Sequence, residues 1–312
     1  MARIPTTVML SAVFSLGLGA QTVKASASPA GDTVEHRSFF SAALQRDLSY
    51  EVVLPVGYAE SQQRYPVLYL LHGWAGDETN WVNLTHLVEL ASKYRLLIVT
   101  PRAENSWYVN SATTPADRYE DAITHDLIAE IDANYRTIAS QHERAVAGLS
   151  MGGYGAMLYT LKHPELFGVA ASLSGAFAGP AGIEDVMPQL KPSTDAAFGP
   201  PGSAERRDDD LDTWIARDDP SSLPYLFLEC GTTDPLLASN RRVVAQLSAR
   251  RFAYEYHEMP GSHTWSFWDH ALLMMLDVIA QQLHVEPAAP ASRAAAAHTT
   301  PHGKEPHVSS LR

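Results

Sequence analysis

A serine stands between two glycines in Gly148-Leu149-Ser150-Met151-Gly152, a G-x-S-x-G pentapeptide. An apolar run, Ala145 to Leu149, precedes it, and a helix-like segment from Met151 to Lys162 follows it. This strand–turn–helix context is typical of a nucleophile elbow, a strained turn that exposes the serine hydroxyl and has room only for very small residues around it. The pentapeptide alone also fits a glycine-rich turn without chemistry, so its meaning depends on the rest of the chain.

A serine hydroxyl is a weak nucleophile that needs a neighbouring base, itself oriented by a carboxylate. Asp234, in G-T-T-D-P, and His263, in G-S-H-T-W, each follow a segment with the composition of a strand. Both come after Ser150 in the order serine, acid, histidine that such elbows require. The carboxyl ends of parallel strands open at one edge of a sheet, so we predict a catalytic triad of Ser150, Asp234 and His263 there.

Other titratable residues are placed less favourably for this chemistry. His257 and Glu229 lie inside predicted strands, where their side chains point along a sheet face, and His270 lies within the last predicted helix. The lone cysteine, Cys230, lies in the apolar run Tyr225 to Cys230 and is expected to be a buried, inert thiol that forms no internal disulfide.

Acyl transfer further requires two N–H donors for the developing oxyanion. The N–H of Met151 follows the serine and is one candidate. We expect the N–H of Trp74 to be the other, because Leu71 to Gly76 follows an early predicted strand and Gly73 lets its backbone turn inward. His72 is expected only to support this loop. Trp107, Tyr108 and Trp265 are candidate walls of a substrate pocket, although aromatics of this kind are also commonly packed in a core.

The elements that position these residues alternate between strand and helix, which predicts a doubly wound α/β sheet, mostly parallel, with helices on both faces. Two short alternating segments predict antiparallel strands at the start of the sheet, and continuous apolar runs predict strands buried on both faces. The expected strands are Val34–Phe40, Leu48–Leu54, Pro66–Leu71, Leu96–Thr100, Ala145–Leu149, Val169–Leu173, Leu223–Gly231 and Phe252–Glu258; the expected helices are Leu84–Tyr94, Tyr119–Tyr135, Met151–Lys162, Pro235–Arg251 and Trp265–Leu283.

Residues 175–222 interrupt this alternation with Gly, Pro, Asp and Ser. We read them as an insertion of turns and short helices over the carboxyl edge, either lid-like or a mobile surface excursion. The alternation covers residues 35–285, after a loose linker at 28–34. Residues 286–312 are of low complexity and are expected to be a disordered tail, whose His298, His302 and His307 we expect to be solvated rather than bound to metal.

Composition limits the classes of function. The chain has 312 residues, 46% of them apolar, and a net charge of −12, which disfavours nucleic acid and anionic membranes as partners. Residues 1–27 have a basic start, an apolar stretch from Val8 to Ala20 and a small-x-small site at Ala25–Ala27. This pattern predicts a secretory signal peptide, the alternative being a disordered or anchoring N-terminus. We therefore expect a secreted or periplasmic protein without a membrane-spanning segment.

Several of these motifs together resemble the esterase D-like, S-formylglutathione hydrolase-like family of α/β-hydrolases over about residues 35–285. They are Leu70-Leu71-His72-Gly73, Asn80-Trp81, Ala147 to Gly153, Cys230-Gly231-x-x-Asp234 and Gly261-x-His263-x-Trp265. Asn105 to Tyr108 and Trp265-x-x-Trp268 look most similar to the secreted tributyrin, feruloyl and acetyl xylan esterases of that family. The resemblance implies the nucleophile Ser150, the acid Asp234, the base His263 and oxyanion donors at Trp74 and Met151.

The predicted function is that of a serine carboxylic-ester hydrolase that works through an acyl-enzyme, without metal or organic cofactor. Its expected substrates are short-chain acyl, acetyl or hydroxycinnamoyl esters, either small molecules or carbohydrate-linked. Three alternatives remain: an acyltransferase to a sugar or lipid alcohol, an S-formylglutathione hydrolase-like thioesterase, and a non-catalytic carbohydrate-binding protein on the same scaffold. Composition and motifs do not indicate an oligomeric state.

Overall fold

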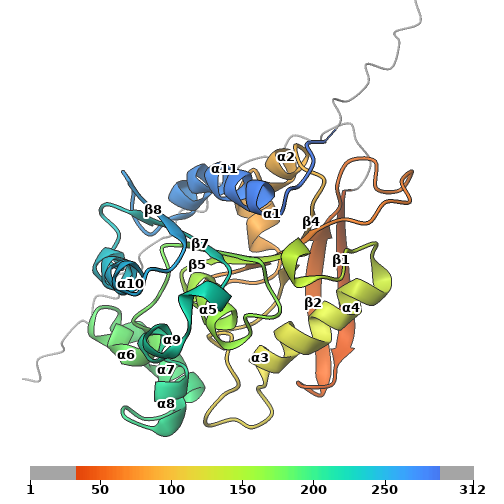
Figure 1. The fold of residues 1–312 in the computed structure, drawn as a ribbon. Helices are drawn as coiled ribbons and strands as arrows, with labels where there is room; N and C mark the ends of the chain where they lie inside the picture. The colour runs from red at the N-terminus through yellow and green to blue at the C-terminus, as the bar shows by residue number, and fades with distance from the viewer. Residues whose placement is uncertain (1–32, 289–312) are drawn as a thin grey trace, which may run out of the picture.

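A twisted sheet of eight strands runs through the computed structural model, which describes residues 33–288 (Figure 1). The strand order is β1-β2-β4-β3-β5-β6-β7-β8. β1 pairs antiparallel with β2 and β2 antiparallel with β4, whereas all other neighbours are parallel. The strands are β1 (Val34–Ser41), β2 (Arg46–Val53), β3 (Val67–Leu71), β4 (Leu97–Pro101), β5 (Arg144–Leu149), β6 (Val169–Leu173), β7 (Tyr225–Gly231) and β8 (Tyr254–Met259).

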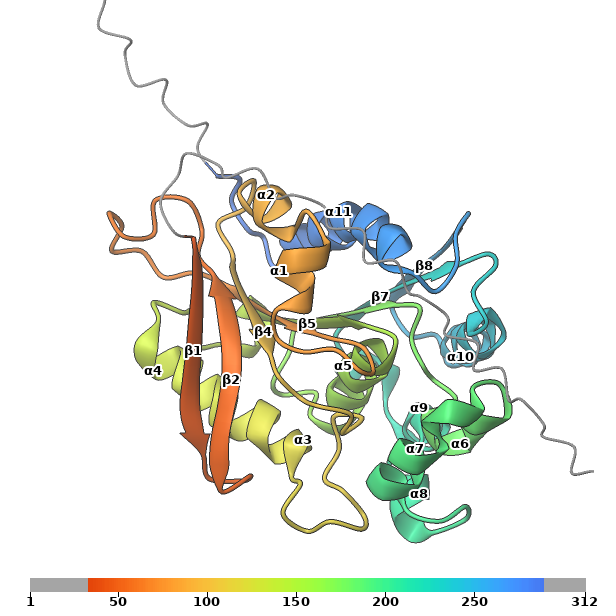
Figure 2. The ribbon, with the colours of Figure 1, turned by 180° about the vertical axis from the view of Figure 1, so that it is seen from behind.

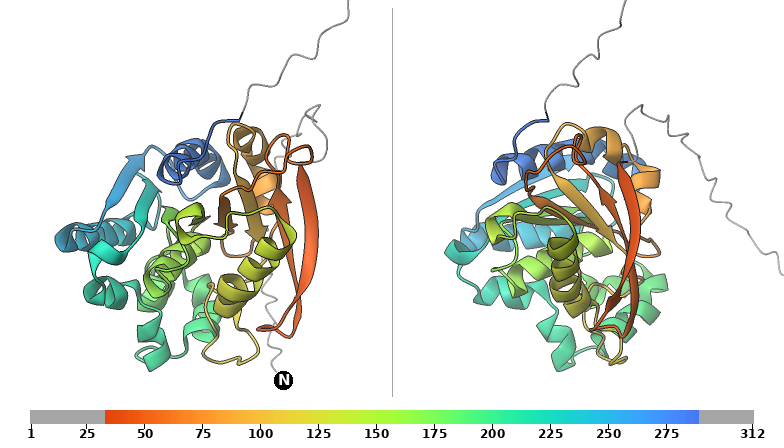
Figure 3. Two further views of the ribbon diagram at one scale, coloured as in Figure 1. Left: turned by 45° about the vertical axis from the view of Figure 1, so that its right-hand side comes forward. Right: turned by 90° about the vertical axis from the view of Figure 1, so that its right-hand side faces the viewer.

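The central strands are buried on both faces, as their continuous apolar runs predict. Every residue of β3, β4, β5 and β6 is buried. The antiparallel pair β1–β2 forms one edge of the sheet, with β1 largely open to solvent (Figure 3). The predicted mostly parallel sheet, with two antiparallel strands at its start, is therefore confirmed.

Helices cover both faces of the sheet (Figures 1 and 2). On one face, α1 (Asn80–Leu84), α2 (Leu87–Ala91) and α11 (Trp265–Gln282) enclose one apolar core. On the other face lie the π-helix η1 (Ala122–Leu127), α4 (Ile128–Asn134), α5 (Met151–Lys162) and α10 (Leu237–Arg250), which enclose the second core. α3 (Tyr119–Asp121) leads into η1, and the short 3-10 helix η2 (Gln141–Glu143) precedes β5.

The segment between β6 and β7 consists of short helices gathered at one end of the molecule (Figure 2). A buried arginine holds them together: Arg206, only 5% exposed, donates to the carbonyls of Gly199 and Pro180 and pairs with Glu184 and Asp195. These helices are α6 (Gly179–Gly182), η3 (Ile183–Asp185), η4 (Pro188–Leu190), α7 (Lys191–Phe198), α8 (Ala204–Asp208), α9 (Leu211–Arg217) and η5 (Pro220–Ser222). The insertion is thus packed around its own buried cation.

Two helix predictions need correction. The helix expected at Leu84–Tyr94 is reduced to the short α2, and α1 ends at Leu84 just before it. Thr85 between them is extended, and its hydroxyl donates to the carbonyl of Trp81 and accepts the N–H of Leu87. Such local bonds compete with helical ones. The helix expected at Tyr119–Tyr135 is continuous but contains the six-residue π-helix η1, which its sequence periodicity did not reveal.

Strand and domain ends also differ slightly from expectation. β7 begins at Tyr225 rather than Leu223, because Pro224 lacks the N–H that a ladder needs. The ordered chain continues past residue 285: Glu286 pairs with Arg95, and the N–H of Ala288 donates to the carbonyl of Lys93. The predicted tail therefore begins at least three residues too early. The predicted signal peptide and the rest of the tail lie outside the described residues.

Within residues 33–288, no helix combines the length and the apolar character needed to cross a membrane.

Candidate active site

Ser150 occupies a strained turn between β5 and α5. Its backbone has φ 52° and ψ −115°, outside the regions that ordinary L-residues favour. Two bonds to neighbouring segments hold this conformation: the Ser150 N–H donates to the carbonyl of Leu173, and the Ser150 carbonyl accepts the N–H of Ala176. The geometry is that of a nucleophile elbow, with the side chain at the start of a helix.

The two glycines that flank Ser150 are required by close backbone approaches. A Cβ on Gly148 would lie 2.4 Å from the carbonyl carbon of Gly152, and a Cβ on Gly152 would lie 2.5 Å from the carbonyl oxygen of Leu71. Both neighbours are backbone atoms that cannot move aside. The tight turn and its close approach to β3 therefore require glycine at positions 148 and 152.

Asp234, His263 and Ser150, which come from three loops at the carboxyl edge, form a continuous chain of hydrogen bonds. His263 Nδ1 lies 3.0 Å from Asp234 Oδ2, and His263 Nε2 lies 3.0 Å from Ser150 Oγ. Asp234 is 5% exposed and also accepts the N–H of Leu236. The structure thus brings together the three residues that the sequence pattern singled out.

The proton positions in this chain follow from the charge of Asp234. Burial alone would raise the pKa of Asp234, but the hydrogen bond and charge of His263 and the Leu236 N–H hold this pKa below its usual value. An ionised carboxylate only accepts hydrogen bonds, so Nδ1 of His263 carries a proton. In a neutral imidazole Nε2 is then free to accept the Ser150 hydroxyl proton, which is the arrangement a general base needs.

The loop after β3 passes directly beside the elbow. A Cβ on Gly73 would lie 3.5 Å from Ser150 Cβ and 2.6 Å from Leu149 Cδ1. Within residues 33–288, neither the Trp74 N–H nor the Met151 N–H has a protein acceptor. Two free N–H groups next to a serine are what an oxyanion hole provides.

His72 fixes the direction of the peptide unit that carries the Trp74 N–H. His72 Nδ1 lies 2.7 Å from the carbonyl oxygen of Gly73, and because a carbonyl only accepts, Nδ1 is the donor. Nε2 accepts the N–H of Ala103 at 2.9 Å. Burial lowers the pKa of His72, in agreement with a neutral ring. The carbonyl of Gly73 and the N–H of Trp74 belong to one planar peptide and point in opposite directions, so holding one aims the other.

Further contacts hold the same loop from outside. Asn105 Oδ1 accepts the N–H of Ala75 at 2.7 Å, and the Tyr108 hydroxyl donates to the carbonyl of His72 at 2.9 Å. The indole N–H of Trp74 donates to Ser193 Oγ of α7 at 3.1 Å. Sequence reasoning did not assign roles to Asn105 or Ser193, because their partners are 30 and 119 residues away.

The three aromatic residues considered as pocket walls differ in burial. Trp107 and Tyr108 have no exposed surface, and Trp107 packs edge-on against Tyr154 and near Phe198. These two fit the packed-core alternative, since a fully covered ring offers no face to a substrate. Trp265 is partly exposed, and the Trp74 side chain, which sequence reasoning considered only for its N–H, is 37% exposed.

Strained backbone is concentrated around the site. Of the nine non-glycine residues with positive φ among those described, six lie in loops after β3, β4, β5 and β6: Ala75, Glu104, Trp107, Tyr108, Ser150 and Ser174. Such conformations cost energy and persist only where the surroundings impose them, commonly at functional sites. The strain therefore marks the same edge of the sheet as the hydrogen-bonded chain.

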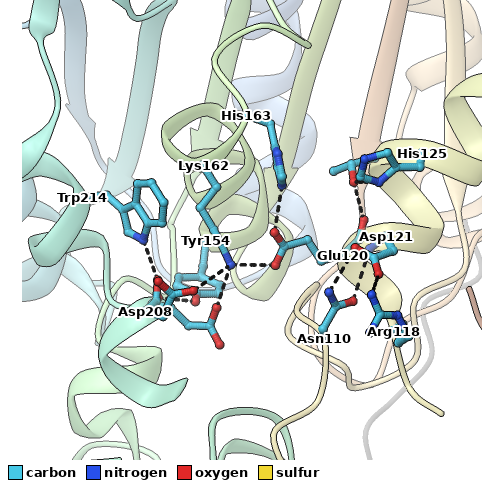
Figure 4. Close-up of polar contacts among 12 residues, drawn as sticks. Asn110, Arg118, Glu120, Asp121, His125, Tyr154, Lys162, His163, Asp208 and Trp214 are labelled. Atoms are coloured by element: carbon cyan, nitrogen blue, oxygen red, sulfur yellow. Dashed lines mark hydrogen bonds and ion pairs between the residues drawn. The ribbon is translucent and has the colours of Figure 1, made fainter. Parts of the chain in front are cut away.

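An ion-pair network anchors the far end of α5 (Figure 4). Lys162 Nζ lies 2.8 Å from Glu120 Oε2 and 3.2 Å from Asp209 Oδ1, and His163 Nε2 lies 2.8 Å from Glu120 Oε1. The Tyr154 hydroxyl donates to the carbonyl of Asp209. The network joins α5, which begins at Met151, to the insertion and to α3, so it helps to fix the helix that follows the elbow.

No group of three His, Cys, Asp or Glu side chains in residues 33–288 is arranged to hold a metal ion.

The chain has the fold of an α/β-hydrolase. This follows from the order of its strands, from the elbow after β5 and from the chain order Ser150, Asp234, His263. The model of the family described as "Putative esterase" matches residues 41–279, and the chain belongs to this family. It is a carboxylic-ester hydrolase of the esterase D-like type. The resemblance inferred from its motifs is thereby confirmed.

The sequence relatives of this chain include named esterases. The chain is 28% identical over 247 residues to an acetyl esterase of Caldicellulosiruptor saccharolyticus, covering 74% of this chain and 92% of the relative. It is 31% identical over 252 residues to esterase Rv1288 of Mycobacterium tuberculosis, covering 73% of this chain but 55% of the relative. The chain thus spans nearly all of the first relative and about half of the second.

Solved structures share the fold. A ferulic acid esterase superposes with a TM-score of 0.68 at 24% identity, covering 80% of this chain and 98% of that one. The Staphylococcus aureus fluorophosphonate-binding serine hydrolase FphF superposes with a TM-score of 0.71 at 23% identity, again covering 80% and 98%.

Proposed function

We propose that this ester hydrolase uses Ser150 as nucleophile, His263 as general base and Asp234 as the orienting acid, and that it forms an acyl-enzyme. The observation that carries the proposal is the unbroken chain from Asp234 through His263 to Ser150, with 3.0 Å at each link. The strained backbone of Ser150 and the two free N–H groups beside it support the same assignment.

In the first half-reaction, His263 Nε2 takes the hydroxyl proton as Ser150 Oγ attacks the ester carbonyl carbon. The carbonyl oxygen becomes an oxyanion and accepts the N–H groups of Trp74 and Met151. The ionised Asp234 stabilises the imidazolium without taking its proton. His263 then protonates the departing alcohol, and the acyl group stays on Ser150. Water repeats the cycle, with His263 again as base.

We further propose that the substrates are short acyl, acetyl or hydroxycinnamoyl esters, either free or linked to carbohydrate. The named acetyl esterase relative, matched over almost its whole length, supports the short acyl group. In this proposal the partly exposed Trp74 and Trp265 flank the bound ester. The N-terminal pattern supports export, and mass spectrometry of the mature protein would test cleavage after Ala27.

The test replaces Ser150 with Ala and measures kcat and KM on p-nitrophenyl acyl esters, methyl ferulate and acetylated xylan. We expect kcat to fall about 10³–10⁶-fold, because the nucleophile is lost while the oxyanion donors remain. A fluorophosphonate probe should label the wild type and not the variant. Near-wild-type turnover by the Ser150→Ala variant would overturn the assignment. The relative rates within the ester panel decide the acyl class.

A further inference from the structure

A single hydroxyl of the insertion joins two tryptophans from different loops. Ser193 Oγ, on α7, accepts the indole N–H of Trp74 at 3.1 Å and the indole N–H of Trp107 at 3.1 Å. Its own proton goes to the carbonyl of Leu190 at 2.8 Å. With one proton donated and two accepted, this hydroxyl uses its full hydrogen-bonding capacity.

The insertion holds Ser193 in a fixed place. Trp107 is fully buried and packs 5.4 Å, centroid to centroid, from Phe198 of α7. At the C-terminal end of α7, the hydroxyls of Ser111 and Thr113 donate to the carbonyl of Ala196. Together with the buried Arg206 within the insertion, these contacts make α7 a rigid support rather than a loose flap.

Trp74 is the least restrained of the groups that meet at Ser193. Its side chain is 37% exposed, whereas that of Trp107 is covered. The backbone on either side of Trp74 is held, through the Gly73 carbonyl and the Ala75 N–H, but its side chain has the bond to Ser193 as its polar anchor. Loss of that bond would free the indole and loosen the residue that carries the proposed oxyanion donor.

We propose that Ser193 is a positioning residue for ester hydrolysis: it fixes the indole of Trp74, and through it the loop 72–76, against the insertion. The proposal rests on the proposed function, because it takes the Trp74 N–H as an oxyanion donor. It also assigns the insertion a part in catalysis without requiring it to open or close.

Replacement of Ser193 with Ala should lower kcat about tenfold with little change in KM, because a misplaced oxyanion donor weakens transition-state binding more than substrate binding. Ser193→Thr keeps the hydroxyl and should restore most of the rate. Ser222→Ala is the matched control, since that exposed insertion hydroxyl bonds only within its own turn, to the carbonyl of Asp219. Its kcat should equal that of the wild type.

A double-mutant cycle separates this role from a purely structural one. Trp74→Phe keeps an aromatic ring but removes the N–H, so adding Ser193→Ala to it should change kcat less than twofold. Fully additive losses would overturn the proposal, since Ser193 would then act through Trp107 and the core. Amide hydrogen exchange of residues 72–76 should be faster in Ser193→Ala than in Ser222→Ala, and equal exchange would also overturn it.

The Ser150→Ala variant distinguishes this proposal from the proposed function. If hydrolysis survives without Ser150, both fall together. If hydrolysis depends on Ser150 but kcat of Ser193→Ala is within twofold of the wild type, only the role of Ser193 is refuted.

Discussion

His72 makes two bonds of different consequence, and two substitutions can separate them. Its Nδ1–H donates to the Gly73 carbonyl, which aims the Trp74 N–H, while its Nε2 accepts the Ala103 N–H, which ties the loop to the next strand. The amide nitrogen of asparagine can take the place of Nδ1, and the amide oxygen of glutamine can take the place of Nε2. His72→Asn therefore keeps the first bond, and His72→Gln keeps the second.

The expected magnitudes follow from the burial of the groups left behind. His72 is 1% exposed, so His72→Asn leaves the Ala103 N–H without its acceptor, which costs about 1–3 kcal/mol of folding free energy. In His72→Gln the Gly73 carbonyl still accepts the N–H of Gly76, so its loss of stability should be about 1 kcal/mol. Its kcat should fall about 10- to 100-fold, less than the roughly 10²–10³-fold expected for losing an oxyanion donor outright, because the Trp74 N–H is misaligned rather than removed.

The assay pairs urea unfolding with kcat on a short p-nitrophenyl ester, measured well below the unfolding midpoint. His72→Gln should be the slower enzyme and His72→Asn the less stable one. If kcat follows stability in both variants, or if His72→Gln retains full kcat, the histidine only supports the loop. The reasoning about the Gly73–Trp74 peptide would then be refuted.

Two further predictions concern the elbow and pH. Gly152→Ala should abolish soluble folding or lower kcat at least about 10²-fold, because its Cβ would lie 2.5 and 2.6 Å from the carbonyl oxygens of Leu71 and His72. Circular dichroism and kcat measure the two effects, and a fully active variant would contradict the prediction. Burial lowers the pKa of His72, so below about pH 6.5 the unfolded chain binds a proton that the folded chain lacks. The free energy of unfolding therefore falls by up to about 1.4 kcal/mol for each pH unit of acidification. Asp209 has the opposite effect on stability. Burial raises its pKa to about 6 although Lys162 lies nearby, so the protonated carboxyl stabilises the folded chain at low pH, and this stabilisation is lost as the pH rises through 6. Urea unfolding at pH 7.5 and 5.5 gives the free energy of unfolding lost on acidification. We expect this loss to be smaller in His72→Asn than in the wild type and larger in Asp209→Asn. The same loss in all three proteins would contradict both predictions.

Much of the sheet and the convergence of the three polar residues could be predicted because each depends on local pattern and topology. The apolar runs of β3 to β6 cannot alternate, since both faces are buried, and this marks a parallel sheet. Once the sheet is parallel, residues that follow β5, β7 and β8 must open at one edge. Ser150, Asp234 and His263 meet for that reason, although 113 residues separate the first from the last.

The support of the site could not be predicted because it depends on tertiary contacts without a local signature. Nothing around Ser193 in sequence distinguishes it from other insertion serines; its role follows from two indoles contributed by distant loops. Trp107 and Tyr108 looked suited to a pocket wall, yet positive φ at both turns them into the core. Likewise, the extended Thr85 breaks a helix that its apolar spacing favoured.

The buried thiol of Cys230 has a practical consequence for studying motion in the insertion. Cys230 is fully covered in β7, and burial raises its pKa to about 12, so almost none of it is in the reactive thiolate form at neutral pH. The chain contains no other cysteine. A spin label or fluorophore attached to a cysteine engineered on α8 would therefore be site-specific in the otherwise native protein, without a cysteine-free background.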